Sequence, residues 1–219
     1  MRVHWLALML ISLIALSACG DDESSEQMLE DTTEQQGPVA EEPEETTMRE
    51  RFEGYLQDMH QSTWMVGYDG TIMTTPGEKN EVTFIAFSEG DDRYRLDRIG
   101  GVETRTYILD GTTTVCVGPG EWMCFGEEAL LHDAIYLMES NIERGFFSVE
   151  ASEERTIAGA STECFSITFE DSGSGGYCFT SDGMPLFVSA VVGELESERL
   201  AVEFESDVWD DAWDLPVAE

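Results

Sequence analysis

The chain is poor in basic residues. Lys and Arg number 11 among 219 residues, against 46 Asp and Glu, and the net charge is −35 at pH 7. Binding to nucleic acid needs clustered lysine and arginine, so this balance argues against a nucleic-acid partner. It also argues against electrostatic docking onto anionic lipid. Such acidity is typical of a soluble, self-repelling surface in a salty or cation-rich medium.

The start of the chain has an apolar run that is too short to cross a membrane. Residues 5–15, WLALMLISLIA, would span about 16 Å as a helix at ~1.5 Å per residue, whereas a hydrocarbon core is about 30 Å thick. Arg2 precedes this run. We therefore interpret residues 1–18 as a signal peptide for export.

The apolar run leads into a cysteine. Leu16, Ser17, Ala18 and Cys19 resemble the lipobox of bacterial lipoproteins, in which an aliphatic residue and two small residues precede the cysteine. The resemblance implies diacylglycerol on the Cys19 sulfur, cleavage before Cys19 and acylation of the new amino terminus. Several acyl chains give stable attachment, so we expect a membrane anchor at Cys19. The alternative is ordinary secretory cleavage after Ala18 with an incidental cysteine.

Motifs that carry catalytic or metal chemistry are also missing. The chain has no G-x-S-x-G elbow, no C-x-x-C redox pair and no D-x-D-x-D-G calcium loop. The glycine-rich segment at 173–176 has no following helix and no basic partner, so it does not predict a phosphate site. The sequence therefore predicts a protein that is not an enzyme and holds no cofactor or metal.

Composition divides the chain after the signal peptide. Residues 20–47 hold eleven acidic residues, no basic residue and few apolar ones. Such a stretch cannot bury enough apolar surface to offset its ordering entropy, so we expect residues 19–47 to be a disordered acidic tether that begins with the lipidated cysteine. Residues 48–215 are expected to form a single domain.

Hydrophobic spacing within 48–215 predicts two helices and many strands. Helices are expected at 48–61, with Thr46 or Thr47 as N-cap, and at 127–142. In the last strand, at 198–206, Leu200, Val202 and Phe204 alternate with Ala201, Glu203 and Glu205, which predicts an apolar face and a wet one. The other strands are expected at 63–68, 81–88, 93–98, 104–110, 112–117, 122–125, 155–158, 161–169, 176–180 and 185–192, with a Gly/Ser-rich loop, DSGSGG, before 176.

This order of elements predicts the fold class. Consecutive strands should be neighbours joined by hairpins, which gives an α+β fold with one large, mainly antiparallel sheet. Two helices cannot cover a flat sheet of this size. We therefore expect the sheet to curl around them as an incomplete β-barrel of about ten strands.

Four cysteines remain after Cys19, an even number that suggests two disulfides in an exported domain. Cys116 and Cys124 flank the GPGE turn, and Cys164 and Cys178 flank the DSGSGG loop. In regular hairpins each pair would lie opposite across its strands, which favours 116–124 and 164–178 over the crossed pairings. The spacings C-x₇-C and C-x₁₃-C are unlike zinc knuckles, although a site of four thiolates is the alternative.

Arginine is concentrated in one predicted strand. Arg93 and Arg95 share a strand face by alternation, with Arg98 and Arg105 close in sequence. One interpretation is that they balance neighbouring carboxylates. The other is that Arg93 and Arg95 meet an anionic headgroup at the rim of a cavity, because the arginine fork suits phosphate and carboxylate.

The chain resembles the LolA/LolB-like superfamily of envelope proteins, which includes the LppX/LprG lipoproteins and the N-terminal domain of RseB. The matching segments are the helix at 48–61, TWMVGYDGTIM, DRYRLDRIGGVETRTYILDGTTTVCV, the helix at 127–142, RTIAGASTECFSITF and the ending ESDVWDDAWDLP. The resemblance implies an N-terminal helix followed by an incomplete antiparallel barrel. Helices close that barrel around an apolar cavity for acyl chains.

The sequence leaves three functions open. The first is a membrane-anchored extracytoplasmic lipoprotein that binds lipid or acyl chains, in lipid or lipoprotein transport. The second is an RseB-like envelope sensor that acts through contacts with an envelope protein, and the third is a structural surface lipoprotein. The first predicts a cavity lined from one face of the strands and one helix; ordinary core packing is the alternative for each lining candidate. These candidates are Trp64, Val66, Phe84, Leu131, Ile135, Met138, Phe165 and Ile167.

Overall fold

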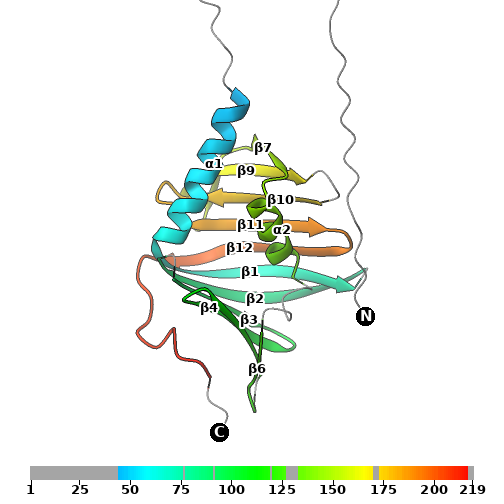
Figure 1. Ribbon diagram of the computed structural model, residues 1–219, viewed down its shortest axis with the longest axis vertical. Helices are drawn as coiled ribbons and strands as arrows, with labels where there is room; N and C mark the ends of the chain where they lie inside the picture. Colours follow the sequence, from blue (N-terminus) through cyan, green and yellow to red (C-terminus); the bar gives the residue numbers. More distant parts are fainter. Residues whose placement is uncertain are drawn as a thin grey trace, which may run out of the picture. The chain divides into compact units, whose positions relative to one another are not determined.

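Alternating apolar residues build one long antiparallel sheet that carries two helices on the same face (Figure 1). The computed structural model describes residues 44–75, 77–90, 92–118, 120–126, 133–169 and 173–216, without the side chains of 44–47 and 74–75. These ranges belong to one compact unit, 42–219. Cys19, the expected signal peptide, most of the expected tether and Leu131 lie outside the described residues.

The sheet has twelve strands, and every described pairing is antiparallel. Its spatial order is β6-β5-β4-β3-β2-β1-β12-β11-β10-β9-β7, and β8 pairs with β9 outside this path. The two ends of this path, β6 and β7, do not pair with each other, so the sheet is a barrel that does not close. The strands are β1 (Thr63–Thr75), β2 (Glu78–Glu89), β3 (Arg93–Ile99), β4 (Glu103–Leu109), β5 (Thr112–Gly118), β6 (Met123–Phe125), β7 (Phe147–Ala151), β8 (Arg155–Ile157), β9 (Ala160–Phe169), β10 (Gly173–Phe179), β11 (Pro185–Val192) and β12 (Leu195–Glu205).

The predicted α+β class and incomplete barrel are confirmed, with twelve strands in the described sheet where about ten were expected. The expected strand list omits β7, whose five residues are too few to stand out as a pattern. Phe147 and Val149 of β7 are nevertheless buried and alternate with exposed residues. This strand forms one end of the sheet by pairing with β9.

Both helices begin at other residues than their spacing predicts. α1 (Glu44–Gln61) starts before Thr46 and Thr47, so neither residue is its N-cap. α2 (Ala134–Glu143) starts after Asp133, which is extended and caps the helix with its carboxylate. A continuous helix over 127–142 is therefore wrong, because an extended residue at 133 cannot belong to it.

The core lies between the helices and the sheet face that they cover, called here the inner face. Phe52 of α1 is fully buried and contacts four other rings, with centroid distances of 5.4–6.2 Å. Burying such rings is the largest favourable contribution that a side chain offers, so this cluster fixes α1 on the sheet. Its other members are Phe147, Phe165, Tyr177 and Phe179.

The glycine-rich segment before residue 176 is a strand and not the expected loop. Residues 173–176 begin β10 and pair with both β9 and β11. A Cβ at Gly175 would lie 2.1 Å from the sulfur of Met138 and 2.6 Å from the carbonyl oxygen of Ser189. Glycine is required there because α2 packs directly onto the strand backbone.

The last strand presents its faces in the opposite sense to the prediction. Ala201 is buried on the inner face, whereas Leu200 and Val202 are exposed on the outer face. Tyr68 pairs with Ala201 while the preceding Gly67 pairs with Glu203, so Val202 is an extra residue in the ladder. Such a bulge changes the parity of the strand, which returns Phe204 to the inner side.

The outer face is partly covered by the C-terminal segment, 207–216. Ala212 is buried with Met65 and Phe87 in a second, small apolar cluster. Trp209 packs edge-on against Phe87 at 5.2 Å, and the hydroxyl of Tyr107 donates to the carbonyl oxygen of Asp214 at 3.1 Å. The segment thus holds β2, β3 and β4 from the side opposite the helices.

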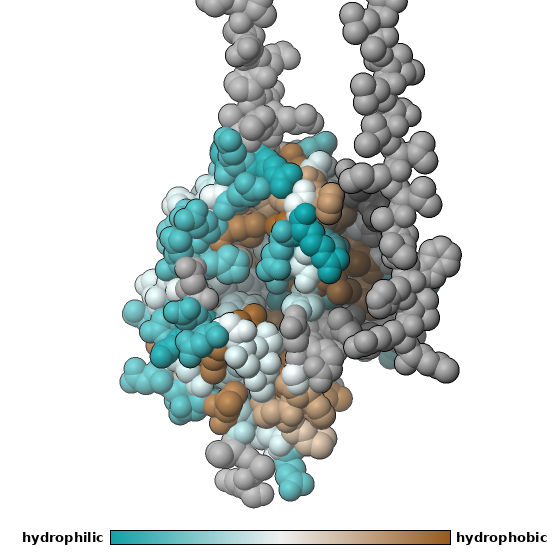
Figure 2. Space-filling model, viewed as in Figure 1, coloured by the Kyte–Doolittle hydropathy of each residue, from teal (hydrophilic) through white to brown (hydrophobic). Residues whose placement is uncertain are grey.

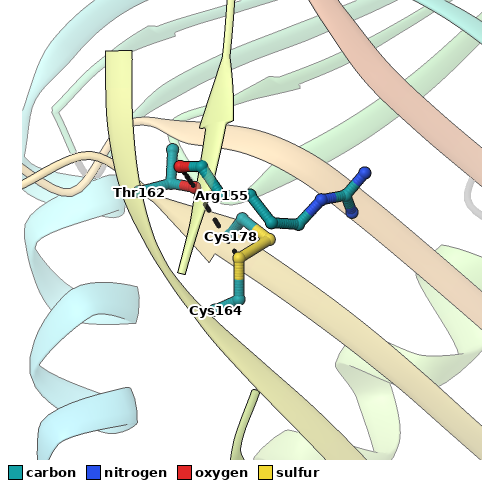
Figure 3. The surroundings of a disulfide bond; sticks show 4 residues. All are labelled: Arg155, Thr162, Cys164 and Cys178. Carbon is teal, nitrogen blue, oxygen red and sulfur yellow. Dashed lines mark hydrogen bonds between the residues drawn. A yellow bond between two sulfur atoms is a disulfide. The ribbon is translucent and has the colours of Figure 1, made fainter. Parts of the chain in front are cut away.

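Two disulfides join the hairpins in the pairing that regular hairpins favour. Cys116 bonds to Cys124 between β5 and β6, and Cys164 bonds to Cys178 between β9 and β10. The second disulfide lies beside the β8 residue Arg155, whose carbonyl oxygen accepts from the hydroxyl of Thr162 at 2.9 Å (Figure 3). Cys164 and Cys178 are both buried, whereas Cys124 is exposed at the edge of the sheet.

Substituting Gly175 by valine tests the contact between α2 and β10. Because backbone atoms of Ser189 cannot move away, we expect Gly175→Val to lower the free energy of unfolding by about 1–3 kcal/mol in urea denaturation. The control is Gly54→Ala, in a part of α1 where a Cβ meets nothing within 4 Å, and it should be neutral or slightly stabilising. A Gly175→Val protein as stable as the native one would contradict this packing.

Removing the disulfides one at a time tests their separate contributions. Replacing either pair by serine should cost about 3 kcal/mol, because loops of this size lose similar closure entropy. The double variant Cys164→Ser/Cys178→Ser should cost more than Cys116→Ser/Cys124→Ser, since it also buries two hydroxyl groups. Urea denaturation under non-reducing conditions measures both, and the reverse order would show that burial does not decide the cost.

Candidate functional site

A cavity of about 250 Å³ opens between the two helices and the inner face of the sheet. In the space-filling view, brown apolar residues show between α1 and α2, while hydrophilic residues cover α1 (Figure 2). A second, smaller cavity of about 40 Å³ shares five of its lining residues and adjoins it. The residues that line the larger cavity are Met59, His60, Trp64, Tyr68, Ala86, Ser88, Gly90, Tyr94, Ile108, Ile135, Glu139, Glu143, Tyr177, Pro185, Val188 and Arg199.

Aromatic side chains from three strands form much of the wall. Trp64 and Tyr94 meet edge to face with ring centroids 6.4 Å apart. The indole N–H of Trp64 donates to the carbonyl oxygen of Met59 at 2.9 Å, and the hydroxyl of Tyr68 donates to that of Pro185 at 2.6 Å. With their polar atoms satisfied by the backbone, these two side chains present mainly apolar ring surface to the cavity.

One arginine is buried in the wall of this cavity. Arg199 of β12 lies on the inner face with its side chain 6% exposed, and its guanidinium lies 4.6 Å from the ring centroid of Phe84. Its Nη2 lies 3.3 Å from Oδ2 of Asp133. Among the described residues, its buried Nε has no hydrogen-bond partner.

Asp133 serves two structures at once. Its Oδ1 accepts from the backbone N–H groups of Ile135 at 2.9 Å and Tyr136 at 3.2 Å, which is an N-cap of α2. Its Oδ2 faces Arg199. The residue therefore links the start of α2 to the charged group on β12.

A second carboxyl lies in the same wall. Glu139 of α2 borders the cavity and accepts a hydrogen bond from the hydroxyl of Tyr177 at 2.9 Å. Desolvation raises the pKa of Glu139, while the hydrogen bond from Tyr177 and the charge of Arg199 partly offset this effect. Glu139 as a whole is nevertheless exposed, so water weakens these effects.

Burial keeps the phenols of the cavity neutral. Desolvation raises the pKa of Tyr68, Tyr94 and Tyr177 above the ordinary value, so each hydroxyl retains its proton at physiological pH. Desolvation also opposes the charge of Arg199, but the nearby Asp133 carboxylate and the other acidic groups outweigh it and the pKa of Arg199 is raised. Arg199 is therefore a permanent buried cation.

Of the eight predicted lining residues, two border the cavity. Trp64 and Ile135 lie in its wall, and Leu131 lies outside the described residues. The other five are buried on the inner face as part of the hydrophobic core. Strand alternation assigned these residues to the correct face of the sheet, but it could not predict where on that face the cavity lies. These five are Val66, Phe84, Met138, Phe165 and Ile167.

Arg93 and Arg95 do not lie at the rim of the cavity. Arg93 is exposed and pairs with Glu89 at 2.9 Å. Arg95 is buried on the outer face, where Nε and Nη2 bond to Asp97 and Nη1 donates to the carbonyl oxygen of Ala212 at 2.5 Å. The expectation of a headgroup site is corrected because the parity of β3 turns both side chains away from the helices, and neighbouring carboxylates balance them.

The sequence analysis missed the polar residues of the cavity. Arg199 follows Glu198 and precedes an alternation of apolar residues and glutamates, so the sequence suggests that it belongs to a solvent-exposed face. Tyr94 and Glu139 occur in segments from which only the apolar residues were used, to predict a strand and a helix. A weak signal did exist, since Ser197, Arg199 and Ala201 share one strand face and could have been read as an inner face with a buried charge.

Among the described residues, no helix combines the length and apolarity needed to cross a membrane. The same residues contain no group of three or more His, Cys, Asp or Glu side chains that could hold a metal ion. What they do contain is a cavity with apolar and aromatic walls, one buried cation and hydroxyl donors. This combination can hold a small amphiphilic molecule by its tail and its polar end.

The raised pKa of Glu139 predicts a pH-dependent stability. A carboxyl that ionises at higher pH when folded binds more protons in the folded state, so stability falls as pH rises above about 4.5 toward the folded pKa. Glu139→Gln keeps an acceptor for Tyr177 and removes this loss, so its Tm should exceed that of the native protein at pH 8. Thermal unfolding should show the difference shrinking toward pH 4.5, and a constant difference would contradict the assignment.

Comparison with known proteins shows the fold. No protein-family model matches the chain, and no curated protein matches its sequence. The crystal structure of MucB is similar with a TM-score of 0.54 at 14% identity, over 79% of this chain and 64% of MucB. MucB in the Pseudomonas aeruginosa MucA/MucB complex gives a TM-score of 0.50 at 12% identity, over 78% of this chain and 61% of that one. The chain therefore spans less than two thirds of the length of these proteins. The similarity of the structures confirms the expected LolA/LppX/RseB-like fold.

Proposed function

We propose that this protein is an extracytoplasmic, membrane-anchored binding protein that holds an acyl chain in the cavity between its helices and the inner face of its sheet. The observation that carries the proposal is the cavity of about 250 Å³ with Trp64, Ile135 and Val188 in its wall. Protein interiors are close-packed, so an unfilled space of this size beside a well-packed cluster indicates a binding site.

Three further observations support this function. Open, mainly apolar pockets with a few polar groups are typical ligand sites. Two disulfides suit an oxidising compartment outside the cytoplasm. The sequence up to Cys19 has the pattern of an exported lipoprotein, whose acylated cysteine would hold the domain at a membrane.

The proposed binding surface consists of residues in two layers. Trp64 and Ile135 contact the ligand directly, and Leu131 is proposed to extend the same surface from the segment before α2. The buried side chains of Val66, Phe84, Met138, Phe165 and Ile167 lie in the core of the inner face and support the wall. A binding role, without catalysis, is what such a surface supports.

Native mass spectrometry of the exported chain from Gly20 to Glu219 tests the proposal, because this length contains every described element. We expect a co-purifying lipid or fatty acid in one-to-one ratio, identified after extraction. A bare protein mass that stays unchanged after incubation with phospholipid and fatty-acid mixtures would overturn acyl binding. It would favour a protein partner, as MucB has in its complex with MucA.

A matched pair of variants locates the ligand. Ala86 is buried and borders the cavity, so Ala86→Leu should fill part of it and lower lipid occupancy. Thr83→Leu adds similar bulk on the same strand, but on the exposed outer face, and should leave occupancy unchanged. Equal loss in both variants would mean that the lipid binds elsewhere.

A further inference from the structure

A buried cation with unmet hydrogen-bonding capacity lies in the cavity wall. Arg199 offers five N–H donors, yet its hydrogen bond to Asp133 is 3.3 Å long and its Nε has no partner within the described chain. A buried donor without an acceptor costs stability, so an arrangement of this kind needs a compensating role. The ligand that occupies the cavity can supply the missing acceptors.

Asp133 cannot fully neutralise Arg199. Its other oxygen is already engaged by two backbone N–H groups at the start of α2. A second cation, Arg98, lies within electrostatic range of both residues, and its own Nε is also buried without a partner in the described residues. Two arginines thus face Asp133, whose charge is shared with a helix terminus, and Glu139 is the other carboxylate that interacts with Arg199.

We propose that Arg199 binds the carboxylate of a single-chain fatty acid whose tail lies in the cavity. The proposal rests on the acyl-binding function above and names its ligand class. A carboxylate presents two acceptor oxygens to the arginine fork, which is the pairing that guanidinium groups favour. The hydroxyl of Tyr94 lies beside Arg199 and keeps its proton, so it can donate to the same group.

Size limits the ligand to one short chain. The cavity of about 250 Å³ is below the ~300–1,000 Å³ of pockets for drug-sized ligands. A lipid with two or three long chains would leave most of its apolar surface outside.

The other titratable groups that border the cavity are Glu139, Glu143 and His60. Glu139 and Glu143 are both exposed, so water screens part of the charge of each. Glu139 is the acidic group that competes with an incoming carboxylate, since it lies in the same wall and interacts with Arg199. Removing its charge should therefore tighten the binding of an anion.

Three eight-carbon probes separate the headgroup from the tail. Isothermal titration calorimetry of the delipidated chain from Gly20 to Glu219 would compare octanoate, 1-octanol and octylamine at pH 8. We expect octanoate to bind at least about tenfold more tightly than either other probe, as for a hydrogen bond to a charged group. Equal affinities for octanoate and octanol, or a preference for octylamine, would overturn the carboxylate assignment while acyl binding stands.

Variants then assign the preference to Arg199. Arg199→Met should bind octanoate and octanol equally, and Arg199→Lys should keep part of the preference because it retains the charge but loses the fork. Glu139→Gln should tighten octanoate several-fold and leave octanol unchanged, which decides the question even if Arg199→Met fails to fold. An undiminished octanoate preference in folded Arg199→Met, or no effect of Glu139→Gln, would refute the inference. If none of the three probes binds, the acyl-binding function itself fails.

Discussion

The inner face of the sheet has to be covered, and helices of 18 and 10 residues cannot cover twelve strands. The sheet therefore curls around the helices. The aromatic cluster around Phe52 fills the space between α1 and the sheet. Between the end of α1 and α2, side chains do not fill the space above the sheet, and this unfilled space is the cavity. The same constraint explains Gly175, because α2 can lie close enough to the sheet only where a strand has no side chain.

The charged cluster follows from how α2 is held. Its N-cap, Asp133, needs a counter-charge when the helix end lies against the sheet, and Arg199 on the inner face provides it. The pair of Asp133 and Arg199 places a cation in a wall that apolar side chains would pack more easily. Buried ion pairs contribute little to stability. The cost is understandable if Arg199 also recognises a ligand, since stability is commonly sacrificed where a binding group must stay unpaired.

Two arginines on opposite faces of the sheet illustrate how parity decides function. Arg95 and Arg199 are equally deep, but Arg95 has a bidentate carboxylate partner in Asp97 and a carbonyl oxygen in the C-terminal segment. It is a structural residue that holds 207–216 on the outer face. Arg199 has a long hydrogen bond to Asp133, a hydrogen bond to Tyr94 and, among the described residues, an unpartnered Nε. The sequence offered Arg95, and not Arg199, as an alternative binding candidate because arginines cluster around residue 95. Which arginine has its hydrogen bonds satisfied is visible only in three dimensions.

Local patterns in the sequence determined the fold class, most strands, both hairpin disulfides and the face on which the apolar candidates lie, because these depend on spacing along the chain. Three features were decided by tertiary structure alone. The bulge at Val202 inverted the faces of β12, pairing with β9 and β11 made residues 173–176 a strand, and the incomplete cover of the inner face located the cavity. Each depends on which distant segments meet, and a one-dimensional pattern of polar and apolar residues does not contain that information.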